Sequence, residues 1–125
     1  MRVSNPKFQA LINQALEDLP GEHVKNIRNV AILFQDEPDA NQRQSLKLDQ
    51  YHTLLGLYEG TPLSERQGQT TLLPDRITLF KKPLEMKSNS EAELKRNIRH
   101  TLWHEIAHYY GLNHSKINDL ENPSN

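Results

Sequence analysis

The segment from residue 91 to residue 110 constrains the fold of this chain most, because its apolar residues repeat with the spacing of a helix. Ser90, followed three residues later by Glu93, has the capping-box pattern of a helix start. Gly111 stands where a left-handed cap commonly ends a helix. Residues that are four apart would form one apolar face of this helix: Leu94, Ile98, Leu102 and Ile106.

A second amphipathic helix is predicted over residues 5–19. Asn5 is a suitable N-cap, Pro6 suits the first helical position, and Pro20-Gly21 ends the pattern. The apolar residues of this segment recur at helical spacing and would share one face: Phe8, Leu11, Ile12, Ala15, Leu16 and Leu19.

Three strands are expected between the two helices. Residues 27–34 are rich in apolar and β-branched types, and residues 51–59 have a similar composition. Gly56 in the second strand indicates a bulge or a close approach of the backbone to another element. Residues 75–80 alternate between polar and apolar types as a half-buried strand does, and Pro83 ends that strand.

The order of helix, strands and helix predicts an α+β domain with one small sheet. The polar stretch from 40 to 50 has no clear period and fits either a loop or a short solvated helix. The chain has 125 residues, which fits a single domain spanning 1–125 with one modest core.

The composition excludes several classes of function. Lys and Arg number 15 against 16 Asp and Glu, so there is no electrostatic reason to expect binding of nucleic acid or of an anionic membrane surface. The absence of Cys excludes disulfides, thiol nucleophiles and Cys-ligated metals. No apolar run approaches a membrane span and the start lacks a signal-peptide core, so a cytoplasmic location is expected.

A metal-binding pattern lies inside the long helix. His104 and His108 are four apart, so both imidazoles project from one helix face and can reach one zinc ion. Glu105 is close enough to reach a metal-bound water without being a ligand. Gly111 lets the chain turn back and bring His114 to the same metal. Three His and one water form the open site that catalytic zinc needs.

Chance does not account for this extended pattern, which is expected roughly 10⁻⁴ to 10⁻⁵ times per chain of this composition. The alternative to catalysis is a zinc-binding domain that acts as an interaction module. Structural zinc usually has four protein ligands and the motif shows three, although Asp119 could supply a fourth. Residues suited by their chemistry to substrate binding or oxyanion stabilisation are Tyr58, Tyr109 and Tyr110.

The motif is that of the metzincin-type zincin peptidases. The chain resembles, more closely, the small bacterial zincin-like metallopeptidases described as a minimal matrix-metalloprotease-like domain. The resemblance runs from about Phe8 to Leu120, and its matching stretches are residues 54–60, 73–80 and 101–108. Metzincins also carry a Met-containing turn downstream of the third ligand. No Met follows His114, so a metal site that is open on one side is expected.

This resemblance implies a compact zincin-like α+β fold, with a small mixed sheet packed against an N-terminal helix and a long active-site helix. It also implies a Zn²⁺ cofactor and a peptide or protein substrate. By the same resemblance His104 and His108 are zinc ligands, His114 takes the position of the third ligand, and Glu105 is the general base.

Overall fold

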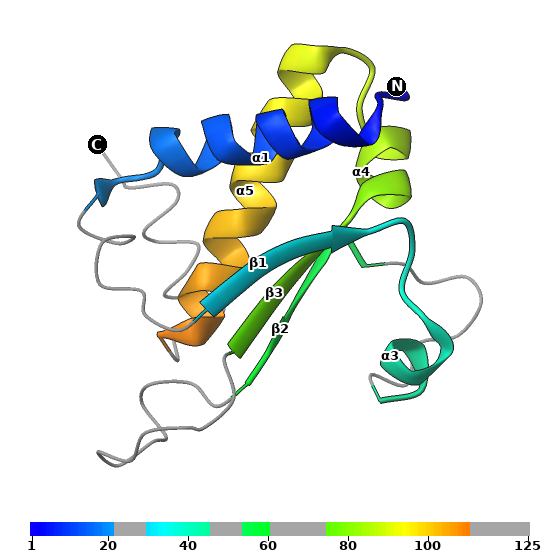
Figure 1. The fold of residues 1–125 in the computed structure, drawn as a ribbon, viewed down its shortest axis with the longest axis vertical. Coiled ribbons are helices and arrows are strands. Elements are labelled where there is room, and N and C mark those ends of the chain that lie inside the picture. The colour runs from blue at the N-terminus through cyan, green and yellow to red at the C-terminus, as the bar shows by residue number, and fades with distance from the viewer. Residues whose placement is uncertain (22–29, 46–53, 61–74, 111–125) are drawn as a thin grey trace, which may run out of the picture.

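The computed structural model describes residues 1–21, 30–45, 54–60 and 75–110. The described elements form one sheet with helices packed against it, which confirms the predicted α+β class (Figure 1). The elements are, in chain order, α1 (Asn5–Asp18), β1 (Val30–Gln35), α3 (Ala40–Ser45), β2 (Gly56–Glu59), β3 (Asp75–Phe80), α4 (Lys81–Lys87) and α5 (Glu91–Tyr109).

The sheet has three strands in the order β1-β3-β2. β1 runs parallel to β3, with Val30 opposite Asp75, whereas β2 runs antiparallel to β3, with Gly56 opposite Leu79. β3 is therefore the central strand, and β2 lies at one edge of the described sheet. This arrangement confirms a small mixed sheet.

The central position of β3 explains a difference from the half-buried strand that the sequence predicts. Only Arg76 is exposed in β3, and the polar residue Thr78 is buried, with 3% of its surface exposed. Thr78 lies opposite Leu33 of β1 and Leu57 of β2, so apolar neighbours flank it on both sides. The alternating pattern predicted the strand bounds correctly but not the burial of its second face.

The start of α1 differs from the sequence prediction by one residue. The N-cap of α1 is Ser4, whose Oγ accepts a hydrogen bond from the Lys7 N–H at 3.2 Å. The prediction that Asn5 caps this helix is wrong, because Asn5 is the first helical residue. The side-chain oxygen of Asn5 instead accepts a hydrogen bond from Lys81 Nζ at 2.8 Å, which ties α1 to α4.

The sequence left open whether the polar stretch from 40 to 50 is a loop or a short solvated helix, and the start of α3 decides this for the described residues. Residues 40–45 are helical, and Asp39 Oδ1 accepts a hydrogen bond from the Gln42 N–H at 2.7 Å. Gln42 Oε1 accepts in return from the Asp39 N–H at 2.9 Å. These reciprocal bonds make a capping box, so the short solvated helix is the correct alternative over the described residues.

α4 was not predicted. The strand ends at Phe80, and α4 follows at once. Pro83 lies in the first turn of α4, where its missing N–H breaks no helical hydrogen bond. Pro83 therefore belongs to a helix start and does not itself end the strand.

Where the structure describes them, three of the remaining predicted bounds differ by one residue: α1 ends at Asp18, α5 ends at Tyr109, and β1 continues to Gln35. In α5 the Ser90 side chain accepts a hydrogen bond from the Glu93 N–H at 3.1 Å, as the capping pattern predicts. β2 starts at Gly56, later than predicted, because the described residues Leu54 and Leu55 are not in the strand, whereas residues 27–29 and 51–53 lie outside the described part. Gly111 also lies outside it.

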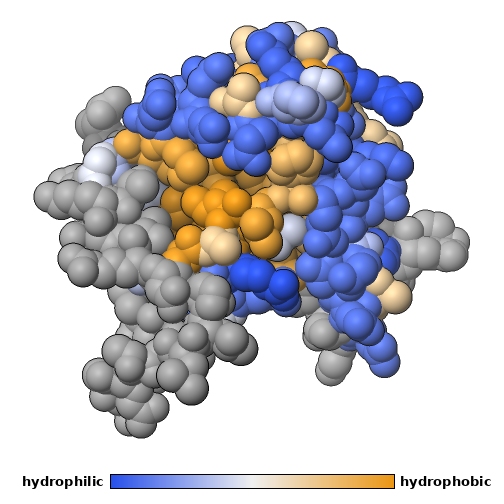
Figure 2. Space-filling model, in the orientation of Figure 1, coloured by the Kyte–Doolittle hydropathy of each residue, from blue (hydrophilic) through white to orange (hydrophobic). Residues whose placement is uncertain are grey.

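The hydrophobic core lies between α1, α5 and the sheet. The four predicted apolar residues of α5 are completely buried, and most of the predicted apolar face of α1 joins them. On the face shown in Figure 2, apolar side chains gather between polar regions. Among the described helices, none is long and apolar enough to cross a membrane.

We predict that Ile98→Ala lowers the free energy of unfolding by about 2–5 kcal/mol, because it leaves a cavity at a fully buried position. Chemical denaturation monitored by circular dichroism measures this loss. Met86→Ala is the matched control, because Met86 is 86% exposed, and it should change stability by less than about 0.5 kcal/mol. Equal effects of the two substitutions would contradict the core assignment.

Candidate metal centre

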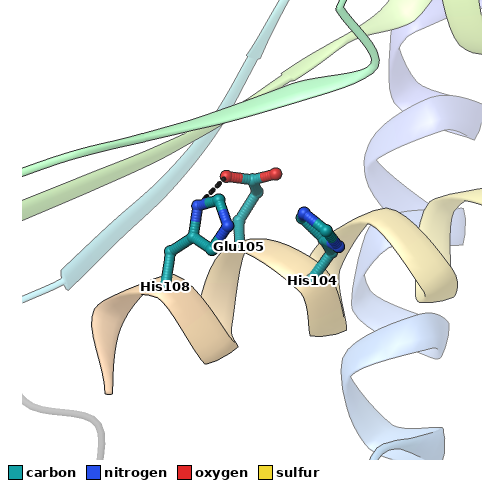
Figure 3. A group of neighbouring side chains, drawn as sticks. All are labelled: His104, Glu105 and His108. Atoms are coloured by element: carbon teal, nitrogen blue, oxygen red, sulfur yellow. Dashed lines mark ion pairs between the residues drawn. The ribbon is translucent and has the colours of Figure 1, made fainter. Parts of the chain in front are cut away.

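α5 brings three potential metal ligands together near its C-terminal end. The ligand atoms of His104, Glu105 and His108 all lie within 4.8 Å of one another. The two imidazole rings are one helical turn apart, with a centroid separation of 4.8 Å. In Figure 3 the Glu105 carboxylate and both rings lie on the side of α5 toward the sheet.

The carboxylate of Glu105 is buried at 6% exposure. A buried charge is costly unless hydrogen bonds replace its lost water. Glu105 Oε1 accepts a hydrogen bond from the backbone N–H of Tyr58 at 3.0 Å, and His108 Nδ1 lies 3.4 Å from the same oxygen. The carboxylate is therefore held between a sheet strand and one of the predicted metal ligands.

The contact with Glu105 changes the acidity of His108. The hydrogen bond from the imidazole to the Glu105 carboxylate raises the pKa of His108 above its ordinary value, against the opposing effect of burial. Since metal ligation requires the neutral imidazole, protons compete more strongly at His108 than at an unperturbed histidine.

The donor set fits a zinc ion. Imidazole nitrogen and carboxylate oxygen are both zinc donors, and here they lie within 4.8 Å of one another. His114 lies outside the described residues, so its assignment as the third ligand stays a prediction.

The three tyrosines predicted to contact substrate form an aromatic row beside this group. Tyr109 lies between the other two in the row, with ring centroids 6.2 Å from Tyr58 and 5.2 Å from Tyr110. Tyr109 is only 2% exposed and belongs to the core, whereas Tyr58 and Tyr110 are half-buried. Burial raises the pKa of the Tyr110 phenol. The role of these tyrosines toward substrate stays a prediction.

The sequence did not indicate the partner of Tyr58. The Tyr58 hydroxyl donates a hydrogen bond to Asp75 Oδ2 across the β2–β3 pair, and Asp75 is buried. An Asp at the start of a strand is usually solvated, so its type alone gives no signal. This hydrogen bond to Asp75 orients Tyr58, whose backbone N–H donates to Glu105.

The sequence left open whether Gly56 marks a bulge or a close approach of the backbone to another element, and the structure shows a close approach to α5. The pairing of β2 with β3 runs without interruption from Gly56 to Glu59, so no bulge is present within this described strand. A Cβ atom added at Gly56 would lie only 2.6 Å from Thr101 Cγ2 of α5.

A cavity of about 500 Å³ lies away from the motif residues. Its described lining comes from α3 and the side of the sheet that carries Leu33, Thr78 and Arg76. The alternation of side chains places these residues on the opposite face from Ile77 and Leu79, which join the core. No member of the His–Glu–His group is among the described residues that line it.

Comparison with known proteins agrees with this geometry. Residues 27–123 match the family model described as zincin-like metallopeptidase. Among solved structures, the chain is similar to a conserved hypothetical protein from Thermo thermophilus, with 17% sequence identity and a TM-score of 0.57. That match covers 86% of this chain and 94% of the other, and it shows a shared fold. No curated protein matches the chain significantly.

We predict that Glu105→Gln lowers the pKa of His108 in the metal-free protein, because the amide lacks the charge that raises it. Because the pKa of His108 is raised in the folded protein, its protonated imidazole stabilises the fold at pH values below the unfolded-state pKa. This stabilisation is lost as the pH rises through the folded-state pKa of His108. NMR titration of the imidazole Cε1–H measures the change. Glu93→Gln, in the first turn of the same helix, is the control and should leave His108 unchanged. A His108 titration unaltered by Glu105→Gln would contradict the contact.

Proposed function

This chain belongs to the zincin-like metallopeptidase family, and on that premise we propose that it hydrolyses peptide bonds as a zinc-dependent peptidase. The observation that carries the proposal is the convergence of His104, Glu105 and His108 on one side of α5. A carboxylate next to two imidazoles supplies both the ligands and the base that this reaction requires.

His104 and His108 would hold the zinc ion, with His114 as the third ligand. Zinc, when bound, supplies a Lewis acid that polarises the scissile carbonyl and makes water acidic enough to ionise near neutral pH. The two described imidazoles are already one helical turn apart, so they need little reorganisation to share an ion.

Glu105 acts as general base in this proposal. Its carboxylate takes a proton from the attacking water as the new C–O bond forms, and then delivers that proton to the amine nitrogen as the C–N bond breaks. The burial of Glu105 and its hydrogen bond from the Tyr58 N–H support this role, because they hold the carboxylate in one place beside the two imidazoles.

The substrate is a peptide or a protein segment that lies extended along β2. This strand is at one edge of the described sheet and contacts α5 through Glu105. An extended peptide gains affinity from main-chain hydrogen bonds to such an edge. Tyr58 and Tyr110 are the half-buried tyrosines beside this edge and are the proposed substrate contacts, together with the more buried Tyr109.

We predict that Glu105→Gln lowers kcat/KM for peptide hydrolysis by about 10²–10⁴-fold while one zinc per chain remains bound. The substitution keeps the shape and an acceptor oxygen but removes the base. Cleavage of a peptide library and elemental analysis measure the two quantities. Cleavage at the wild-type rate in this variant would contradict the mechanism. Zinc binding without any hydrolysis by the wild-type chain would favour the interaction-module alternative.

We predict that His108→Ala lowers both the zinc content and the zinc-dependent rise in melting temperature, because zinc stabilises only the state that binds it. His100→Ala is the matched control, since His100 lies about two turns before His108 on α5 and is not in the ligand group. Elemental analysis and thermal unfolding with and without zinc measure the effect. Unchanged zinc stoichiometry in His108→Ala would refute the ligand assignment.

A further inference from the structure

The first residue of β2 lies against α5 at a point where no side chain fits. A Cβ atom at Gly56 would be 2.6 Å from Thr101 Cγ2, and 3.4 Å from both Glu105 Cγ and Leu79 Cδ2. The closest of these contacts is far inside van der Waals distance. Thr101 is buried and its methyl is on a short, branched side chain, so it has little room to yield.

Residue 56 is glycine because there is no space for a side chain, and not because its backbone conformation excludes other residues. Among the described glycines only Gly60 has a positive φ, at 153°. The backbone of Gly56 is in a strand conformation that any residue can adopt. A substitution at Gly56 therefore tests the approach of β2 to α5 without adding backbone strain.

The close contact between Gly56 and Thr101 and the hydrogen bond from Tyr58 to Glu105 link the same two elements, β2 and α5. Thr101 and Glu105 are one turn apart on α5, and both are buried. Gly56 and Tyr58 are two residues apart on β2, so their N–H groups point in the same direction. The Tyr58 N–H donates to Glu105 Oε1 at 3.0 Å, beside the place where Gly56 meets Thr101.

We propose that Gly56 and Thr101 are positioning residues that set the separation of β2 from α5, so that the Tyr58 N–H holds the Glu105 carboxylate in place. Relieving a 2.6 Å contact requires the strand to move away by roughly 1 Å. A shift of that size would take the 3.0 Å bond from Tyr58 to Glu105 out of hydrogen-bonding range. The catalytic consequence rests on the proposed role of Glu105 as general base, whereas the positioning itself does not.

The experiment uses the full chain and four variants: Gly56→Ala, Thr101→Ser, the double variant, and Gly21→Ala. Thr101→Ser removes the methyl that the new Cβ would strike. Gly21→Ala is the matched control, since a Cβ at Gly21 meets no atom within 4 Å. Amide hydrogen exchange of Tyr58, followed by ¹⁵N NMR on the metal-free protein, and the melting temperature are the readouts.

We expect Gly56→Ala to speed exchange of the Tyr58 amide by about tenfold or more and to lower the melting temperature by roughly 5–10 °C. The double variant should recover both quantities toward those of Thr101→Ser alone, and Gly21→Ala should change neither. Unaltered Tyr58 protection in Gly56→Ala, or a defect that Thr101→Ser does not relieve, would overturn the proposal. Where Gly56→Ala fails to fold, a folded double variant supports it and an unfolded one overturns it.

Hydrolysis assays distinguish a failure of this positioning proposal from a failure of the proposed peptidase function. In an active enzyme, Gly56→Ala should lower kcat more than it raises KM, and Thr101→Ser should restore kcat. An unchanged kcat despite lost Tyr58 protection would overturn the catalytic consequence of the positioning. A wild-type chain that binds zinc but cleaves no peptide would refute the proposed function, and the exchange and rescue measurements would still decide whether Gly56 and Thr101 position Glu105.

Discussion

The structure depends on one constraint, which is that α5 must complete the core and carry the proposed metal ligands at the same time. Its apolar residues are fully buried against α1 and the sheet, including Ile98 and Ile106. The side of α5 toward β2 carries Glu105, and the half-buried His104 and His108 lie beside it. Since one rigid helix carries both sets, the position of the site is determined by the packing of the core.

Burying a carboxylate beside the core has an electrostatic cost, and the sheet offsets it. Unlike a central strand, β2 has an edge whose N–H groups are not taken by a neighbouring strand of the described sheet, and it directs the Tyr58 N–H to Glu105. His108 approaches the same oxygen and gains a raised pKa from it. The carboxylate therefore stabilises the charged form of His108, and a metal ion that binds the neutral imidazole must displace this arrangement.

Local patterns predicted the features that depend on residues near one another in the sequence. The bounds of β3, the capped start of α5 and the grouping of His104, Glu105 and His108 all follow from short-range spacing. α4 was missed because Pro83 suggests a strand end as well as a first helical turn. The Tyr58–Asp75 bond was missed because it depends on the register of two strands, which composition does not determine. Gly56 was recognised as unusual, but its neighbour on α5 was not.

This difference between short-range and long-range information bears on how the motif should be interpreted in any chain. The spacing of His104 and His108 is sufficient to place two imidazoles together, because a helix alone produces that geometry. The environment of Glu105 has another origin, since Tyr58 and Gly56 reach it from a strand more than forty residues away in the sequence. A chain with the same helical motif but a bulky residue in place of Gly56 would keep the arrangement of its two helical imidazoles and lose the strand contact to the carboxylate of Glu105. The motif is thus evidence for a metal site, and the position of the edge strand separately supports the proposed role of Glu105.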